Sequence, residues 1–129
     1  MFKMSTFEES KSEPMVNSEL DEDIVSRFSP QQALTYFNLY LKNAGSILES
    51  MARDFQNNDI ESIRARAHKL KGSSMVIGAT KMKELAAEIE KNAKENGKAD
   101  AEKFEHLKEQ FAQLVNLLKS RYNINFVQL

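Results

Sequence analysis

A histidine at position 68 and the residues around it are the part of this chain whose types and spacing best suit chemistry. His68 stands within A-H-K-L-K-G-S-S-M, residues 67–75. Neutral imidazole is a nucleophile near pH 7, because its unperturbed pKa is about 6.5. On a helix, Arg64 and Gly72 would lie one turn to either side of His68, with Lys71 at i+3. The two cations suit the transfer of a negatively charged phosphoryl group, whose oxygens they would hold.

The predicted helix around this histidine places it on the solvent side. At about 100° per residue, the apolar stripe of the helix centres between Ile63 and Ser74, about 130° from His68. Met75, at i+7 from the histidine, flanks the same face and is a candidate docking residue. Gly72 within a helix costs about 1 kcal/mol relative to Ala. We therefore interpret it as clearance for a partner that closes over the imidazole.

Each of these residues also has an interpretation without chemistry. The histidine could be an ordinary surface residue, and Arg64 and Lys71 could only solvate the helix. Gly72 could allow a neighbouring helix to pack closely, although its position opposite the apolar stripe argues against this. Taken together on one face, the four residues favour the functional interpretation.

A short motif in this region resembles a known family. The stretch at residues 68–74, H-K-L-K-G-S-S, followed by Gly78 and Ala79, is similar to the signature around the phosphoacceptor histidine of the histidine phosphotransfer (HPt) domain family. The resemblance is sharp over residues 64–90 and extends more loosely to the whole chain from about residue 19. It implies that His68 is the phosphorylation site.

The same resemblance implies roles for the neighbouring residues. Lys71 would be a cation on the phosphate side, and Gly72 would be the clearance residue. In this family a Gln or Glu from the next helix often hydrogen-bonds the acceptor imidazole, and Glu90 occupies that place here. A carboxylate there would determine which ring nitrogen of His68 carries hydrogen. Alternatively, Glu90 pairs only with Lys94 at i+4.

The resemblance also implies partners. We expect the chain to relay a phosphoryl group between receiver-domain aspartates, one receiver from a hybrid sensor histidine kinase and one from a response regulator. Any Mg²⁺ would belong to those receivers, so no cofactor or metal is expected on this chain. The sequence has no glycine-rich ATP-binding loop, which predicts a phosphoryl carrier without autokinase activity, and not an enzyme. The alternative is a non-catalytic helical adaptor that docks receiver domains.

Composition predicts that helices position these residues. The 129 residues include 41% hydrophobic residues, four Gly and two Pro, and good helix formers are abundant. The connections between the predicted long helices are short, so neighbouring helices must run antiparallel. We therefore predict an all-α fold, an antiparallel up-down-up-down four-helix bundle with a short extra N-terminal helix.

Capping residues and apolar stripes give the bounds of the predicted helices. Expected N-caps are Ser18, Ser29, Asn58 and Asp100, and expected ends are near Phe28, Asn57, Gly78 and Gly97. Ser29, Pro30 and Gln32 give the strongest start signal, at N-cap, N1 and N3. The stripes are Ala33, Phe37, Tyr40, Ala44, Ile47, Met51 and Phe55; Ile60, Ile63, Ala67, Leu70, Ser74 and Ile77; Met82, Leu85, Ile89 and Ala93; and Phe104, Leu107, Phe111, Leu114 and Leu118.

Charge and composition limit the other classes of function. Residues 1–26 hold seven acids and two bases, whereas residues 27–129 hold sixteen bases and twelve acids. We predict a flexible acidic tail over 1–17 and a histidine phosphotransfer domain over 18–129, whose evenly mixed charges argue against nucleic acid. With no Cys and no apolar run near the roughly 18 residues of a membrane span, we expect no membrane partner and a cytoplasmic location. We also expect a monomer, because the apolar stripes are satisfied within one bundle. His106 is expected to be a surface residue without a metal role.

Overall fold

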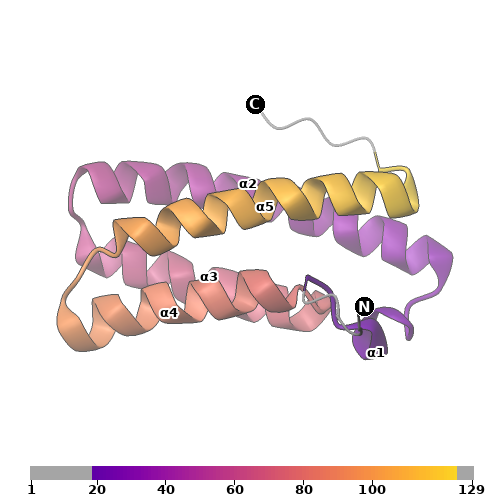
Figure 1. Cartoon of the computed structure of the whole chain (residues 1–129), viewed down its shortest axis with the longest axis horizontal. Helices are drawn as coiled ribbons and strands as arrows, with labels where there is room; N and C mark the ends of the chain where they lie inside the picture. The colour runs from indigo at the N-terminus through magenta and orange to yellow at the C-terminus, as the bar shows by residue number, and fades with distance from the viewer. Residues whose placement is uncertain (1–18, 125–129) are drawn as a thin grey trace, which may run out of the picture.

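The structure, a computed structural model, describes residues 19–124, and within that range it contains helices and no strand. One short helix precedes four long ones (Figure 1), which confirms the predicted all-α fold. The helices are α1 Glu22–Val25, α2 Pro30–Gln56, α3 Ile60–Ile77, α4 Thr80–Asn96 and α5 Ala101–Tyr122. In this part of the chain no helix has both the length and the apolar character needed to cross a bilayer. The predicted tail over residues 1–17 lies outside the described residues.

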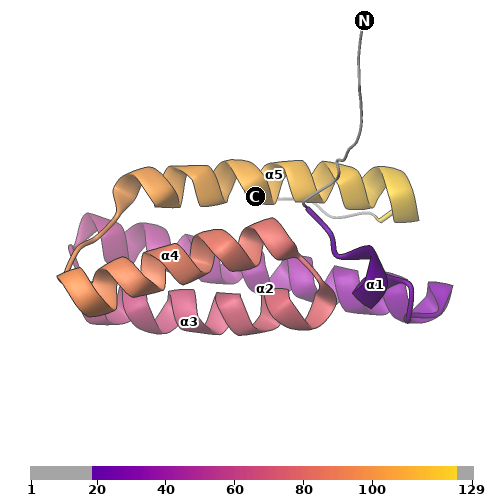
Figure 2. The same cartoon turned by 60° about the horizontal axis from the view of Figure 1, so that its bottom comes forward.

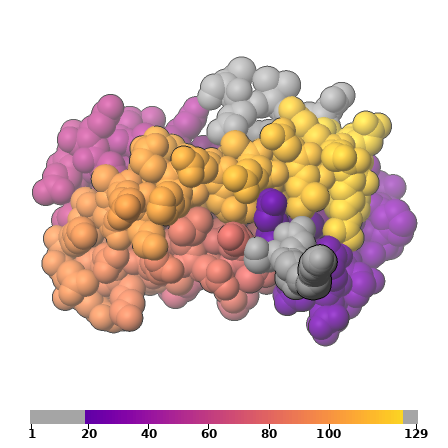
Figure 3. All heavy atoms as spheres, in the orientation of Figure 1, coloured from indigo at the N-terminus to yellow at the C-terminus, as the bar shows by residue number. Residues whose placement is uncertain are grey.

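The four long helices form the predicted antiparallel up-down-up-down bundle. Consecutive helices pack side by side, most extensively α3 with α4, and α2 also packs against α5 to close the bundle (Figures 1 and 2). In the space-filling view, α4 and α5 cover much of the near face (Figure 3). The short α1 lies at one end of the bundle, near the turn between α3 and α4. Side chains on α3 and α4 are therefore placed to meet across their shared contact.

The start of α2 and the ends of α3 and α4 follow the capping signals of the sequence. Ser29 and Gln32 form a reciprocal capping box: the Gln32 amide donates to Ser29 Oγ at 3.1 Å, and the Ser29 amide donates to Gln32 Oε1 at 2.9 Å. Pro30 stands in the first turn, where a missing amide donor is tolerated. Gly78 and Gly97 end their helices in the left-handed region, with φ of 79° and 57°.

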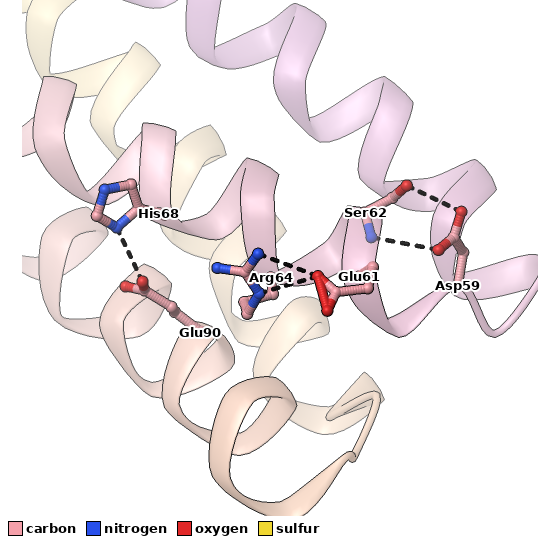
Figure 4. Close-up of polar contacts among 6 residues, drawn as sticks. All are labelled: Asp59, Glu61, Ser62, Arg64, His68 and Glu90. Atoms are coloured by element: carbon pink, nitrogen blue, oxygen red, sulfur yellow. Dashed lines mark hydrogen bonds and ion pairs between the residues drawn. The ribbon is translucent and has the colours of Figure 1, made fainter.

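The start of α3 differs from the prediction by one residue. Asp59, and not Asn58, is the N-cap: its Oδ1 accepts from the Ser62 amide at 3.2 Å, and its Oδ2 accepts from the Ser62 hydroxyl at 2.8 Å (Figure 4). Asn58 has a φ of 51° and belongs to the turn that precedes the helix. A carboxylate suits the cap because the helix dipole is positive at its N-terminus.

The short first helix ends at Val25, earlier than the predicted end near Phe28. Asp21 is its N-cap, whereas the predicted cap Ser18 lies outside the described residues. The Asp21 amide donates to the Gly78 carbonyl at 2.7 Å, which ties this segment to the turn between α3 and α4. The helix begins after Asp21 because the Asp21 carboxylate accepts from the Asp23 amide at 3.0 Å and caps the first turn.

The apolar stripes of the four long helices meet in one core, as predicted. Tyr40 and Ser74 place a polar contact within it, because their hydroxyls hydrogen-bond at 2.7 Å between α2 and α3. The predicted stripe residues that are only partly buried are Ile47, Phe55, Ile60 and Leu85. Leu41, Leu48 and Ala86 are buried although the predicted stripes omit them. A core-facing helix buries a face wider than a single line of residues, and these positions adjoin the stripes.

Candidate functional site

His68 lies at the middle of α3 on the solvent side, as the helix periodicity predicts. Its side chain is 67% exposed. The packing of α4 against α3 brings Glu90 beside it, and His68 Nδ1 lies 2.8 Å from Glu90 Oε2 (Figure 4). The other ring nitrogen, Nε2, points away from Glu90 and makes no hydrogen bond within residues 19–124. The exposed imidazole is therefore held at one nitrogen and open at the other.

The Glu90 carboxylate binds two neighbours at once. Its side chain is only 13% exposed, and its second oxygen, Oε1, lies 2.8 Å from Lys71 Nζ. Burial opposes ionisation of this carboxyl, but hydrogen bonds from Lys71 and His68 outweigh burial and lower its pKa. The carboxyl is therefore ionised near neutral pH. Its contacts are with α3, and it does not form the alternative pair with Lys94.

An ionised Glu90 determines which nitrogen of a neutral His68 carries hydrogen. A carboxylate only accepts hydrogen bonds, so Nδ1 must be the donor. The neutral ring has one N–H, which leaves the lone pair on Nε2. That nitrogen is the one open to solvent. The arrangement thus supplies a nucleophile directed outward, without a general base to activate it.

The two predicted phosphate-binding cations each have an acidic partner. Lys71 is bound to Glu90, and Arg64 contacts Glu61 Oε1 through Nε at 3.1 Å and Nη2 at 3.0 Å (Figure 4). The Glu61 side chain is 82% exposed, and exposed ion pairs of this kind contribute at most about 1 kcal/mol. Arg64 can therefore exchange Glu61 for another anion near His68 with little change in free energy.

Gly72 leaves open space one turn after His68. A Cβ atom at this position would meet no heavy atom within 4 Å outside its own stretch of helix. No neighbouring helix uses the glycine for close packing, so that alternative interpretation is wrong. Met75, further along the same face, is 55% exposed, in agreement with the sequence analysis. The surface beside the imidazole consequently lacks a side chain at Gly72 and carries an exposed apolar one at Met75.

Sequence periodicity did not predict a groove of about 500 Å³ between α2 and α3. We refer to it as the α2–α3 groove, and its lining includes Tyr36, Leu39, Tyr40, Ser73, Val76 and Ile77. Val76 and Leu39 are 70% and 56% exposed, which is unusual for large apolar side chains. The sequence did hold one signal for the groove: Val76 is an apolar residue that lies off the predicted apolar stripe of its helix. Which residue of α2 it would face depends on how the two helices pack.

The second histidine, His106, lies exposed on α5, where it lines a groove with Glu84 and Glu88 of α4. This groove is formed by α4 and α5, whereas His68 contacts α4 from α3. In the part of the chain that the structure describes, no group of three or more His, Cys, Asp or Glu side chains is arranged to hold a metal ion.

Comparison with known proteins points to one family. The family model described as "Hpt domain" matches residues 35–117, a range that includes His68 and Glu90. No curated protein matches the chain. Among solved structures, the chain is similar to the crystal structure of histidine-containing phosphotransfer protein B (HptB) from Pseudomonas aeruginosa PAO1. That match has a TM-score of 0.75 and 20% sequence identity, and it covers 81% of this chain and 95% of the other. At this identity the likeness concerns the fold.

Proposed function

Because the chain belongs to the Hpt domain family, we propose that this histidine phosphotransfer protein carries the phosphoryl group on His68, between the aspartates of two receiver domains. One observation carries the proposal. The hydrogen bond from His68 Nδ1 to Glu90 leaves the Nε2 lone pair exposed on a helix face where a partner can reach it. The proposed partners are the receiver domain of a hybrid sensor histidine kinase and that of a response regulator.

The proposed transfer uses one atom of this chain as the nucleophile. The Nε2 lone pair of His68 attacks the phosphorus of an aspartyl phosphate on the first receiver. The P–N bond forms as the P–O bond breaks, and the electron pair of that bond leaves with the aspartate carboxylate. The ring keeps its hydrogen on Nδ1 and becomes cationic, which the Glu90 carboxylate favours. Transfer to the second receiver reverses these steps, and any Mg²⁺ belongs to the receivers.

Two cations are assigned to the phosphoryl oxygens in this proposal. Lys71 lies one turn from His68 and shares Glu90 with it, so a change of side-chain rotamer brings its ammonium toward a phosphoryl group on Nε2. Arg64 lies one turn to the other side and gives up only an exposed partner. Stabilising a moving phosphoryl group is mainly an electrostatic task, which two cations on one face can perform.

Docking of the receiver is assigned to the surface that continues from the histidine. The open space at Gly72 allows the receiver's active site to close over the imidazole without meeting a side chain. Met75 offers an exposed apolar contact at the edge of that space. A monomeric bundle and a cytoplasmic location are part of the same proposal.

Transfer from a phosphorylated receiver tests the proposal. The full chain is incubated with a receiver carrying labelled aspartyl phosphate, and we expect label on the chain that is labile to acid and stable to alkali. The chain has two histidines, which provides a matched pair of variants. His68→Gln should abolish labelling, and His106→Gln should leave it unchanged. Labelling that survives in His68→Gln would overturn the site assignment, and labelling from ATP alone would contradict a carrier without autokinase activity.

The alternative function is a non-catalytic adaptor that docks receivers through the same surface. The exposed apolar side chains of Met75 and Val76 favour docking in either case. The two functions differ in chemistry alone, so the His68→Gln variant should bind a receiver as the wild type does while accepting no label. Binding without labelling in the wild type, tested with several receivers, would favour the adaptor.

A further inference from the structure

The groove between α4 and α5 is lined by a buried amide that has no hydrogen-bond partner. This α4–α5 groove has a volume of about 310 Å³, and its lining includes Gln110. Gln110 is only 7% exposed, and within residues 19–124 its Nε2 atom meets no acceptor. Buried polar atoms are nearly always hydrogen-bonded, because a donor that has lost water without gaining an acceptor opposes folding. An acceptor that enters the groove would therefore satisfy Gln110.

The Gln110 amide is able to turn toward the opening of the groove. The terminal torsion of a Gln side chain is broad, so its rotation brings Nε2 to a ligand at low cost. A Leu side chain at this position would occupy similar space without burying a donor. The amide therefore suits a ligand better than it suits the core, to which the neighbouring Leu107, Phe111 and Leu114 belong.

Two carboxylates beside Gln110 have no ion-pair partner. Glu84 of α4 and Glu109 of α5 are exposed and line the groove. In the described part of the chain neither forms an ion pair, whereas Glu88 of the same groove pairs with Lys103 at 2.8 Å. Both free carboxylates are thus available to a cation that lies next to the buried amide.

The antiparallel direction of α4 and α5 gives the order of these groups along the groove. Lys81 of α4 lies toward Gln113 of α5 at one end, and Glu84 lies toward Gln110 in the middle. The seven residues from Lys81 to Glu88 span about 10 Å of helix. That length matches about three residues of extended peptide. A ligand that fills the groove consequently meets hydrogen-bond donors and carboxylates within three residues.

A ligand for this groove needs a cation and a hydrogen-bond acceptor close together. Nucleic acid is disfavoured because its phosphates would meet the two free carboxylates. A polyamine or a metal ion offers no acceptor to Gln110, and residues 19–124 hold no group of three His, Cys, Asp or Glu side chains placed for a metal. A peptide that contains arginine has both features, since its carbonyl oxygens accept and its guanidinium pairs with carboxylates.

We propose that the α4–α5 groove binds a basic peptide segment of a partner protein. Gln110 Nε2 donates to a backbone carbonyl of the segment, and the carboxylates of Glu84 and Glu109 bind the arginine side chain beside it. Exposed ion pairs contribute little free energy each, so a short segment binds with a Kd on the order of 1 mM and a whole partner binds more tightly.

The groove and the His68 site lie on different sides of α4. At about 100° per residue, Glu84 lies about 120° and Glu88 about 160° around the helix from Glu90, which contacts His68. A receiver at His68 therefore leaves the groove open, and a partner in the groove leaves His68 open. The proposed binding goes beyond phosphotransfer, because it holds the carrier at a partner while receivers exchange.

Side-chain amide NMR of the full chain tests the site. The tripeptide acetyl-Gly-Arg-Gly-amide, which matches the length of the groove, is titrated into the nitrogen-labelled protein. We expect saturable shifts of the Gln110 side-chain amide signals and none for Gln56, at the end of α2 and outside the groove. An unshifted Gln110, or equal shifts at Gln56, overturns the proposal.

Two further probes test the chemistry of the ligand. Acetyl-Gly-citrulline-Gly-amide has nearly the shape of the arginine peptide without its charge, and it should bind about three- to tenfold more weakly, as for two exposed ion pairs. Spermidine is a cation without an acceptor and should leave the Gln110 amide signals unshifted. Equal affinity for the two peptides, or an equal response to spermidine, overturns the proposal.

The variant Gln110→Leu separates a ligand-binding amide from a structural one. It should leave the midpoint of urea unfolding unchanged or raise it, because it removes an unsatisfied buried donor. It should also bind the arginine peptide about five- to tenfold more weakly, whereas Asn116→Leu, at an exposed amide of α5 outside the groove, should bind as the wild type does. A lower urea midpoint, or equal binding by both variants, overturns the role of Gln110.

Reversal of charge tests the carboxylates without changing the core. Glu84→Lys combined with Glu109→Lys should bind acetyl-Gly-Glu-Gly-amide in preference to the arginine peptide. Glu95→Lys combined with Glu102→Lys, at exposed acids outside the groove, should keep the preference of the wild type. If the groove variant also keeps that preference, the two carboxylates do not bind the ligand.

Labelling by a phosphorylated receiver separates this inference from the proposed function. Saturating arginine peptide should leave the labelling rate of His68 unchanged, and a peptide that blocks labelling shows that the two sites are not separate. Peptide-dependent shifts at Gln110 without labelling by any receiver support the groove and contradict the phosphorelay. Labelling without shifts at Gln110 has the opposite meaning.

Discussion

His68 Nδ1 and Glu90 Oε2 lie 2.8 Å apart across the contact between α3 and α4, and the other oxygen of the same carboxylate lies 2.8 Å from Lys71 Nζ. One acid thus contacts both the proposed nucleophile and the nearest cation. A single amide oxygen could not accept from both neighbours in the same way. The effect of having a carboxylate, and not an amide, at position 90 can therefore be measured.

Glu90 is predicted to act as a positioning residue for the imidazole. In Glu90→Ala the Nδ1 donor loses its acceptor, and we expect transfer to His68 to slow by about tenfold. This is less than the roughly 100-fold or more lost with a general acid or base, because Glu90 only positions the ring. Glu90→Gln should lose less, because its amide oxygen can still accept from His68 Nδ1 although it no longer serves Lys71 as a second carboxylate oxygen does. Nitrogen NMR of the ring should show the Nδ1–H form in the wild type and a mixture of both tautomers in the variants. An unchanged tautomer with an unchanged rate would contradict this role.

Lys71 is predicted to act on the phosphoryl group and not on the imidazole. Lys71→Gln removes a cation from the proposed transition state, and we expect transfer to slow by about tenfold. This effect is smaller than that of removing a hydrogen-bond donor from an enclosed active site, because the site here is exposed to solvent. The His68 tautomer should stay as in the wild type, because Glu90 keeps its contact with Nδ1. Lys94→Gln, at an exposed lysine of α4 to which no role is assigned, provides the control for a change of charge alone.

Gly72 is predicted to show opposite effects on stability and on transfer. A Cβ atom there meets nothing, so Gly72→Ala should raise the free energy of unfolding by about 1 kcal/mol through helix propensity. Gly72→Gln should be nearly as stabilising but should block the receiver, with transfer falling well below that of Gly72→Ala. Urea unfolding and single-turnover labelling measure the two quantities. A transfer rate independent of side-chain size would remove the clearance role.

The buried hydrogen bond between Tyr40 and Ser74 is predicted to contribute to stability without affecting the chemistry. Tyr40→Phe leaves the Ser74 hydroxyl buried without this partner, which should cost about 1–2 kcal/mol in the free energy of unfolding. Ser74→Ala should cost a similar amount, and the double variant should cost less than the sum, since removing both hydroxyls leaves neither unsatisfied. Strict additivity in urea unfolding would show that the two hydroxyls are energetically independent.

Tyr40 also predicts how stability changes in alkaline solution. Burial raises the pKa of its phenol above the usual value, and the hydrogen bond with Ser74 opposes this only in part. The unfolded chain releases the proton near pH 10 and the folded protein releases it only at higher pH. Stability from this site is therefore complete below about pH 10 and declines as the pH rises toward the folded-state pKa. The difference in unfolding free energy between wild type and Tyr40→Phe should narrow from pH 8 to pH 11.

Local signals in the sequence predicted most of the fold. The capping box of Ser29 and Gln32, and the glycines that end α3 and α4, act over four or five residues of backbone, so their effect could be read without the rest of the chain. The prediction was one residue off at Asn58, where two adjacent residues can both cap a helix and only the backbone conformation distinguishes them. The exposure of His68 and Met75 also followed from helix periodicity alone.

By itself, then, the sequence determined the residue types on one face of α3, because positions three, four and seven residues apart share a helix face whatever surrounds it. The tertiary structure alone decided what that face meets. Glu90 is 22 residues from His68. From the sequence it could bond either the His68 imidazole or Lys94, and only the packing of α4 against α3 decided between the two. The α2–α3 groove likewise depends on the packing of two helices. Such packing is set by the whole core, to which side chains from all four long helices contribute at once.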